Sequence, residues 1–220
     1  MRKLDKKQVT DMIKGKSVVI LGSAPSVLYN NRTVIEKHDI VVRLNNFKTS
    51  GYEQKVGART DIYYSFFGSS IKKTAADLKG VRLIYCKYPD CDFREHNDGR
   101  YEDGVSGDFR SVYKFRQRFF NSLNTDIYIP DYSDFLRNFL YANRILTTGV
   151  QCIIDILSHN PKSIHVTGFD FFESGKHNTN ERWTAGDGGH DHNAEKDIVK
   201  NITKYFNVTL DDNIKETLCL

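Results

Sequence analysis

A histidine-rich stretch near the carboxyl end of the chain holds the residue types best suited to chemistry at neutral pH. It runs from Gly188 to Glu195 with the sequence GGHDHNAE, and His177 precedes it. His190 lies just before an expected helix, where an imidazole can act as a general base or donate a hydrogen bond when protonated. The cluster of His190, Asp191 and His192 could instead bind zinc or another divalent ion. A polar loop exposed to solvent is the third interpretation, and these residues alone leave all three open.

A strand-to-helix turn close to the amino end could hold an anionic ligand. The apolar run Val18–Leu21 leads into Gly22 and Ser23, and an expected helix starts at Pro25. Small residues let a ligand approach the backbone closely, and the free N–H groups of a helix start attract phosphate or carboxylate. The segment matches neither the GxGxxG nor the Walker pattern. Taken alone, it supports a nucleotide site and a plain connection about equally.

Amide side chains follow the next expected strand. Asn45 and Asn46 come soon after the apolar run Asp39–Arg43. Ligands of α/β proteins bind at the carboxyl ends of parallel strands, and an amide can read ribose hydroxyls or the edge of a base. The alternative is an asparagine that caps a loop, with Arg43 in a surface ion pair. Without the Gly22 turn, the asparagine segment favours this alternative.

A third segment combines hydroxyl side chains with a glycine. Thr147, Thr148 and Gly149 open an apolar helix, and the strand after that helix ends in the sequence TGFDFF, from Thr167 to Phe172. Hydroxyls and unpaired N–H groups at a helix N-terminus suit a phosphate or a carboxylate. Capping of the helix by Thr147 or Thr148 is the commoner use of such residues, so the segment alone favours capping.

Short apolar runs alternate with segments of helical spacing, which indicates an α/β sheet with helices on its faces. The expected strands are Ser17–Leu21, Asp39–Arg43, Asp61–Phe66, Val81–Cys86, Ile127–Ile129 and Ser163–Thr167. The expected helices are Asp5–Lys14, Pro25–Glu36, Ser70–Leu78, Asp108–Leu123, Ser133–Asn143, Gly149–His159 and Asn193–Phe206. Most strands are short and rich in Val, Ile and Tyr, as buried parallel strands are. We therefore expect one Rossmann-like α/β domain over residues 1–220, with a mostly parallel central sheet flanked by helices.

Length and composition favour a globular domain without a nucleic-acid surface. The chain has 220 residues, 39% of them hydrophobic, and a net charge of +4 from 32 basic and 28 acidic residues. That length is enough to bury a core, and no basic run is dense enough for a nucleic-acid footprint. No apolar stretch reaches the ~20 residues of a membrane span, and no signal sequence follows Met1. We therefore expect a cytoplasmic protein, with peripheral membrane association as a further option.

Two irregular stretches interrupt the α/β pattern. Pro89–Gly107 is charged and contains glycines, and Ser174–Gly189 is polar and glycine-rich. Long irregular segments in compact α/β domains are often substrate lids or binding loops. Each stretch could equally be an ordinary surface loop.

The four cysteines are expected to be free thiols. They are Cys86, Cys91, Cys152 and Cys219, in a chain where no secretory signal is found. The spacing of Cys86 and Cys91 could suit a metal, but no second pair accompanies them.

The segments described above, taken in order, resemble the sialylmotifs of the family 29 sialyltransferases. The large motif would span Ser17–Phe66, with VVILGS, VVRLN, GYE and VGARTD in the order and spacing of the family. The small motif would span Ile145–Phe172, and motif III would lie near His177. The very small motif would begin at His190, and its H-x4-E pattern would end at Glu195. The chain is also similar to the bacterial family 42 sialyltransferases, which share this order of segments.

The resemblance implies a variant GT-A glycosyltransferase fold with a lid-like loop region. It also implies an inverting enzyme that needs no metal and no cofactor, with CMP-sialic acid or a related CMP-sugar as donor and a glycan or glycolipid as acceptor. His190 would be the catalytic base, His177 would stand near the leaving phosphate, and Glu195 would orient the helix that follows. The residues implied at the donor are Gly22, Ser23, Asn45, Ser65, Thr147, Thr148, Gly149, Phe169, Asp170 and Phe172.

Three alternatives remain beside sialyl transfer. A transferase that uses CMP-Kdo or another CMP-ulosonic acid would show the same motifs. A metal-dependent hydrolase would use the His190, Asp191 and His192 cluster, whereas a non-catalytic nucleotide-sugar-binding module would bind CMP without turnover.

A nucleoside monophosphate leaves with less charge than a diphosphate, so positioned hydrogen-bond donors can stabilise it without magnesium. This agrees with the lack of a convincing Asp-x-Asp metal motif in the sequence.

Overall fold

A computed structural model provides the coordinates of the chain. It describes residues 2–68, 71–89, 125–142, 145–175 and 190–220. The expected helix Asp108–Leu123 lies outside the described residues. So do almost all of Pro89–Gly107 and most of Ser174–Gly189, the two irregular stretches for which the sequence leaves lids and ordinary surface loops both open.

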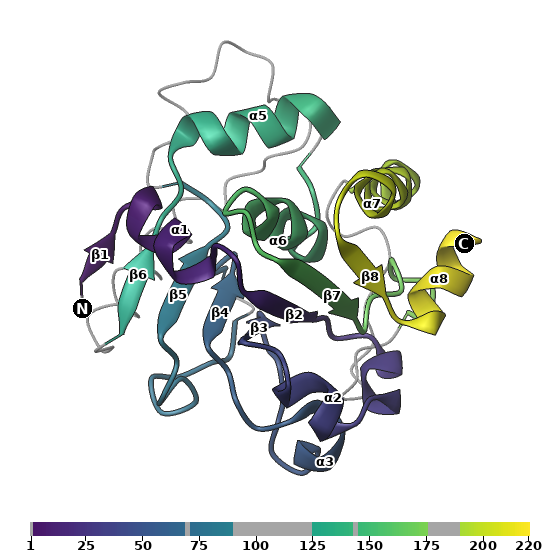
Figure 1. The fold of residues 1–220 in the computed structure, drawn as a ribbon, viewed down its shortest axis with the longest axis horizontal. Coiled ribbons are helices and arrows are strands. Elements are labelled where there is room, and N and C mark those ends of the chain that lie inside the picture. The colour runs from purple at the N-terminus through teal and green to yellow at the C-terminus, as the bar shows by residue number, and fades with distance from the viewer. Residues whose placement is uncertain (1, 69–70, 90–124, 143–144, 176–189) are drawn as a thin grey trace.

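The described residues form an eight-stranded sheet in which every neighbouring pair of strands is parallel (Figure 1). The strands are β1 (Lys3–Leu4), β2 (Ser17–Leu21), β3 (Ile40–Leu44), β4 (Ile62–Ser65), β5 (Leu83–Cys86), β6 (Asp126–Tyr128), β7 (Ser163–Thr167) and β8 (Val208–Leu210). Their order across the sheet is β1-β6-β5-β4-β3-β2-β7-β8. The expectation of a mostly parallel sheet in one α/β domain is therefore confirmed.

Both faces of the sheet are buried at its centre, which explains why a central strand such as β2 reads as a nearly unbroken apolar run. Successive side chains of a strand point to opposite faces. In β2, Val18 and Ile20 belong to the cluster on one face, and Val19 and Leu21 belong to the cluster on the other. A strand with a single buried face would instead alternate between apolar and polar residues.

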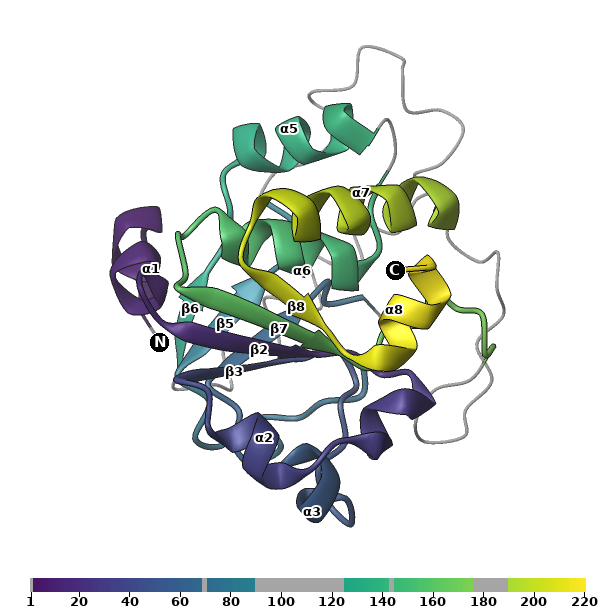
Figure 2. The ribbon, with the colours of Figure 1, turned by 45° about the vertical axis from the view of Figure 1, so that its right-hand side comes forward.

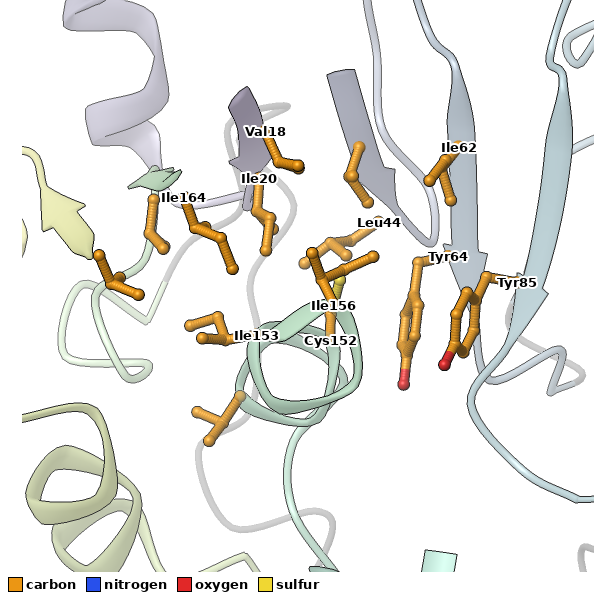
Figure 3. Close-up of a cluster of buried hydrophobic side chains, with 14 of the residues drawn as sticks. Val18, Ile20, Leu44, Ile62, Tyr64, Tyr85, Cys152, Ile153, Ile156 and Ile164 are labelled. Atoms are coloured by element: carbon orange, nitrogen blue, oxygen red, sulfur yellow. The ribbon is translucent and has the colours of Figure 1, made fainter. Parts of the chain in front are cut away.

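Most of the helices cover one face of the sheet (Figures 1 and 2). They are α1 (Lys6–Ile13), α5 (Tyr132–Ala142), α6 (Thr148–Leu157), α7 (His192–Tyr205) and α8 (Asp212–Leu218). Cys152, Ile153 and Ile156 of α6 pack under the strands at the centre of this layer (Figure 3). Full burial of one such isoleucine contributes roughly 1.5–3 kcal/mol, so α6 anchors the layer.

The opposite face is covered by short helices, and here one expected helix is wrong. Instead of a single helix over Pro25–Glu36, the chain forms a 3-10 helix, η1 (Pro25–Tyr29), and then α2 (Arg32–Glu36). Asn31 causes the break, because its side chain accepts a hydrogen bond from the Thr33 N–H (2.8 Å) and caps a new helix. The four-residue α3 (Glu53–Val56), which the sequence does not predict, lies beside α2 (Figure 1).

The expected helix Ser70–Leu78 is also wrong over its described part. Residues 75–80 form turns, and Asp77 accepts hydrogen bonds from the N–H and the hydroxyl of Thr74, each at 2.8 Å. Aspartate makes local bonds of this kind in competition with the helix backbone. The remaining expected helices and strands in the described residues agree with the structure to within two residues at each end. The sequence also misses β1, β8 and α8.

The strand order creates a switch point between β2 and β7. After β2 the chain continues into β3 on one side, whereas β7, much later in sequence, pairs with the other side of β2. Ligands of open α/β sheets bind outside the carboxyl ends of the strands at such a point. Gly22 and Gly168 directly follow these two strands, so the fold places the Gly22 turn where a ligand is expected.

Among the described residues, no helix has the length and apolar character needed to cross a membrane.

Candidate active site

The expected site residues gather at the carboxyl edge of the sheet. Gly22 follows β2, Asn45 follows β3, Ser65 ends β4 and Gly168 follows β7. Because the strands are all parallel, these positions share one edge of the sheet. The same edge carries Lys87, which directly follows β5 and which the sequence analysis did not select.

Phe169 packs its ring against two of the glycines. A methyl group added at Gly22 would lie 2.1 Å from the Gly168 carbonyl oxygen and 2.7 Å from Cδ2 of Phe169, and one added at Gly149 would lie 2.2 Å from its Cε1. The backbone bonds from Gly22 N–H to the Thr167 carbonyl (2.8 Å) and from Ala24 N–H to the Gly168 carbonyl (2.9 Å) hold these turns together. The glycines of the first and third segments thus meet on one aromatic ring.

Asn45 and Ser65 form a second small cluster. The Asn45 side-chain oxygen accepts hydrogen bonds from Ser65 Oγ (3.2 Å) and from the Phe66 N–H (3.4 Å), and Ser65 Oγ in turn accepts one from the Phe67 N–H (3.1 Å). Asn45 has φ +44°, a left-handed conformation that asparagine tolerates better than most residues. These bonds use the amide oxygen, so Nδ2 is the group that could donate to a ligand.

Arg43 is not in a surface ion pair, as one interpretation of the sequence held. It is 2% exposed, and its guanidinium donates to the carbonyls of Val56, Gly57 and Arg59 and to Thr60 Oγ1. Burial lowers its pKa to about 10. Arg43 therefore fixes the VGARTD segment of the large motif in place.

Thr147 and Glu195 connect the start of α6 to α7. Thr147 is the N-cap of α6, because its hydroxyl accepts a bond from the Val150 N–H (3.4 Å), as the capping interpretation predicted. The same hydroxyl donates to Oε2 of Glu195 (2.9 Å), and the Thr147 N–H donates to Oε1. Burial raises the pKa of Glu195 to about 6, although the Thr147 bonds act in the opposite direction. Both donors of Thr147 are thus used within the protein, whereas Thr148 and Gly149 lie half-buried in the first turn of α6.

His190 is hydrogen-bonded to Ile145, two residues before the N-cap Thr147. Its Nδ1 lies 2.7 Å from the Ile145 carbonyl, which can only accept, so Nδ1 carries the proton and the lone pair of a neutral ring lies on Nε2. Burial, followed by the positive charge of Lys87, lowers the pKa of His190 to about 4. The imidazole is therefore neutral at physiological pH, the form in which it can accept a proton.

The loop after β7 packs against the start of α7. The ring centroids of Phe172 and His192 lie 5.0 Å apart, and those of His192 and His190 lie 6.3 Å apart. Asp170 binds within its own turn, where it accepts from the Phe172 N–H (3.0 Å) and from Ser174. The structure thus brings Phe172 near the histidines, and Asp170 shapes the loop that carries it.

For the other two expected site residues, the structure gives a position for one and no position for the other. Ser23 is half-buried in the turn after β2, and His177 lies outside the described residues. In the described part of the chain, no group of three or more His, Cys, Asp or Glu side chains could hold a metal ion. The metal-dependent hydrolase therefore gains no support from the described residues. Cys86 and Cys152 are buried thiols, Cys219 is an exposed thiol, and Cys91 lies outside the described ranges.

Glu195→Ala should destabilise the protein, because it would leave the buried N–H and hydroxyl of Thr147 without their acceptor. Each orphaned donor costs about 1–3 kcal/mol, and Glu195 itself is only 2% exposed. Urea unfolding measures the difference from wild type. Glu216→Ala, on the exposed surface of α8, is the control and should stay within about 0.5 kcal/mol of wild type. Equal stabilities of the two variants would show that the Glu195 bonds contribute nothing.

Known proteins resemble this chain in sequence and in fold. The sequence model of glycosyltransferase family 29 (sialyltransferase) matches residues 26–205. Beta-1,6-galactosyltransferase GALT29A of Arabidopsis thaliana is 43% identical over 56 residues, which are 25% of this chain and only 14% of that protein.

Several solved sialyltransferases share the fold. The monofunctional alpha-2,3-sialyltransferase Cst-I from Campylobacter jejuni gives a TM-score of 0.57 at 19% identity, over 97% of this chain and 80% of that one. A mammalian sialyltransferase in complex with Gal-beta-1-3GalNAc-ortho-nitrophenol gives 0.56 at 15% identity, over 94% and 73% of the two chains. CstII from Campylobacter jejuni in complex with cytidine-5'-monophosphate gives 0.53 at 18% identity, over 90% and 79%.

At these identities the solved structures establish the fold alone, and the family assignment rests on the sequence match. That match takes in most of the chain, including every segment from Asn45 to Glu195 that we selected for its chemistry. The chain therefore belongs to glycosyltransferase family 29, the sialyltransferase family.

Proposed function

We propose that this chain is an inverting glycosyltransferase that moves sialic acid from CMP-sialic acid to a hydroxyl group of a glycan or glycolipid acceptor. The observation that carries the proposal is the state of His190. Its Nδ1 proton is fixed on the Ile145 carbonyl (2.7 Å), so a basic lone pair remains on Nε2 near the carboxyl edge of the sheet. Family membership supplies the reaction class.

In the proposed mechanism, His190 is the general base. Nε2 takes the proton of the acceptor hydroxyl while the acceptor oxygen attacks the anomeric carbon of sialic acid. The bond from that carbon to the phosphate oxygen breaks, CMP leaves, and the configuration inverts. A positioned general base typically contributes ~10²–10⁴-fold to the rate, and holding both substrates in line contributes further.

The donor would bind across the switch point between β2 and β7. Gly22 and Gly149 let the two turns close on Phe169 at this point, and the Asn45 amide could donate to the ribose or the base. The N–H groups of Thr148 and Gly149, in the first turn of α6, would meet the phosphate. In support of this placement, a neighbour with the same fold is crystallised with cytidine-5'-monophosphate. The resemblance also assigns Ser23, Ser65 and His177 to the donor, and these assignments remain part of the proposal.

A galactose donor is the second candidate, favoured by one observation. The relative that is 43% identical over 56 residues is named a beta-1,6-galactosyltransferase, so one segment of this chain is similar to a protein named for another sugar. CMP-Kdo, or another CMP-ulosonic acid, remains an option because it presents the same nucleotide. A galactose donor would thus differ from the CMP-linked donors in its nucleotide. CMP-sialic acid and CMP-Kdo would differ from each other only in their sugar.

A donor panel tests the proposal. The protein would be incubated with a glycan array and, in turn, with CMP-sialic acid, CMP-Kdo and UDP-galactose, and products would be identified by mass spectrometry. We expect a mass gain that corresponds to sialic acid. A product formed with CMP-Kdo or with UDP-galactose alone would replace the proposed donor, and no product from any donor would favour a non-catalytic binding module.

The pH dependence of transfer should reflect the low pKa of His190. Only the neutral imidazole can accept a proton, and burial together with Lys87 lowers its pKa from 6.5 to about 4. Activity should therefore persist as the pH falls through 6.5, and decline only near the lower value. The measurement is kcat/KM from pH 8 down to about pH 3.5, with circular dichroism at each pH to verify folding. An acid limb centred near pH 6.5 in folded protein would contradict the buried, neutral state.

A further inference from the structure

Three titratable side chains hold three consecutive backbone positions ahead of α6. His190 binds the Ile145 carbonyl, Lys87 binds the Leu146 carbonyl, and Glu195 accepts both donors of Thr147. Glu195 lies in the first turn of α7, and His190 lies just before that helix. Lys87 directly follows β5. The segment 145–147 thus ties the expected catalytic base to the sheet.

Lys87 is unusual among the lysines of the described chain because it is buried. It is 2% exposed, and its Nζ lies 2.6 Å from the Leu146 carbonyl oxygen and 4.8 Å from the centre of the Tyr88 ring. Its own N–H donates to the Ser65 carbonyl (2.9 Å), which fixes its backbone to β4. Burial of an ammonium is costly unless the group is hydrogen-bonded, and an exposed lysine would serve equally well if only solubility were needed. The position therefore calls for a specific role.

We propose that Lys87 is a positioning residue of the transfer reaction: it fixes the segment 145–147, and thereby the direction of the His190 imidazole. This inference rests on the proposed function. Lys87 acts through Leu146, the residue between the one that orients His190 and the one that caps α6. Loss of this bond would free the segment to shift, and a displacement of ~1 Å at a catalytic group can reduce the rate by ~10²-fold.

The charge of Lys87 has a second effect on the same histidine. Two titratable side chains act on the charge of His190: Lys87, which follows β5, and His192, the first residue of α7. Asp191, the N-cap of α7, and Glu195, in its first turn, are the acidic residues of the same helix start. After burial, the positive charge of Lys87 is the strongest influence that lowers the pKa of His190. The same charge acts to lower the pKa of Glu195. Lys87 thus favours the neutral imidazole and the ionised carboxylate together.

Substitutions at Lys87 separate these effects. Lys87→Met removes the hydrogen bond and the charge, Lys87→Gln removes the charge but keeps a donor, and Lys87→Arg keeps both. The matched control is Lys79→Met, on the exposed turn before β5. We expect Lys87→Met to lower kcat by ~10–100-fold with a donor KM within about threefold of wild type, and Lys87→Arg to recover most of the loss. The acid limb of the rate should move to higher pH in the Met and Gln variants, because a repelling charge near protonated His190 is gone.

Histidine NMR gives a readout that does not depend on turnover. The His190 imidazole resonance is assigned by its loss in His190→Gln and is followed as the pH is lowered. A titration at higher pH in Lys87→Met and Lys87→Gln than in wild type and Lys79→Met shows the effect of the charge alone. The positioning role holds if, at neutral pH, the resonance of the Nδ1–H that the Ile145 carbonyl accepts is shifted or lost in Lys87→Met and kept in Lys87→Arg, even if no donor is turned over and the proposed function fails. A wild-type Nδ1–H resonance in folded Lys87→Met, or an unchanged kcat where turnover is measured, would overturn the inference. If Lys87→Met does not fold, Lys87→Ala, which also removes the hydrogen bond, decides, and a wild-type Nδ1–H resonance there would overturn the inference equally.

Discussion

Replacement of His190 by glutamine is expected to lower kcat by about 10²–10⁴-fold and to leave the affinity for CMP within a few-fold of wild type. Glutamine can still donate to the Ile145 carbonyl, so the segment that His190 holds should keep its place. It has no basic nitrogen, however, and the acceptor hydroxyl would lose the group that takes its proton. Initial rates with saturating donor give kcat, and isothermal calorimetry gives the affinity for CMP.

His38→Gln is the matched control for this variant. His38 is a half-buried histidine just before β3, at the amino end of the strands, and its ring stacks on His165 at 5.8 Å. Its replacement should leave kcat unchanged, because the site is at the opposite, carboxyl edge of the sheet. A loss of less than about threefold in His190→Gln, or a similar loss in both variants, would remove His190 from the role of base.

Gly22→Ala is expected to have the second large effect. The added methyl would lie 2.1 Å from the carbonyl oxygen of Gly168, a backbone atom that can only move together with the end of β7. Overpacking of this kind costs about 1–3 kcal/mol of stability. We also expect the affinity for CMP to fall by about tenfold or more. The Gly22 turn would be pushed away from the end of β7, and these two segments form the switch point where the nucleotide is proposed to bind. Urea unfolding and calorimetry measure the two effects.

Gly149→Ala provides an informative comparison with Gly22→Ala. Its methyl would meet the Phe169 ring at 2.2 Å, and the three nearest atoms all belong to that side chain. The double variant Gly149→Ala/Phe169→Leu should therefore recover stability relative to Gly149→Ala, whereas Phe169→Leu should not rescue Gly22→Ala, which still meets the carbonyl. Equal rescue of both glycine variants would show that the two clashes have the same origin, contrary to the structure.

The sequence predicts the sheet and one edge of the site for a common physical reason. Strands buried on both faces are largely apolar, as β2 is throughout and β3 is apart from Arg43, so their ends are visible as a change to small or polar residues. Gly22 and Asn45 stand at such changes. All-parallel order then places these residues at one edge, and no knowledge of side-chain contacts is needed.

The contacts that the sequence does not predict are those between distant segments. Nothing near Thr147 in the sequence indicates that Glu195 uses both of its donors, and nothing near Lys87 indicates a bond to the Leu146 carbonyl. Lys87 directly follows a buried strand, as Asn45 does. This position is the feature of the sequence from which Lys87 could have been predicted to lie at the site. Local bonds of single polar residues, such as the cap at Asn31, likewise decide helix breaks that hydrophobic spacing does not show.

The most direct test of the proposed activity is release of CMP from CMP-sialic acid by the wild-type protein in EDTA, without an acceptor. Water then takes the place of the acceptor hydroxyl, so the assay needs no knowledge of the acceptor glycan. We expect repeated turnover in EDTA, with no increase when zinc or magnesium is restored. Absence of release, or release only after metal is restored, would contradict the proposed activity and would return the His190, Asp191 and His192 cluster to consideration as a metal site.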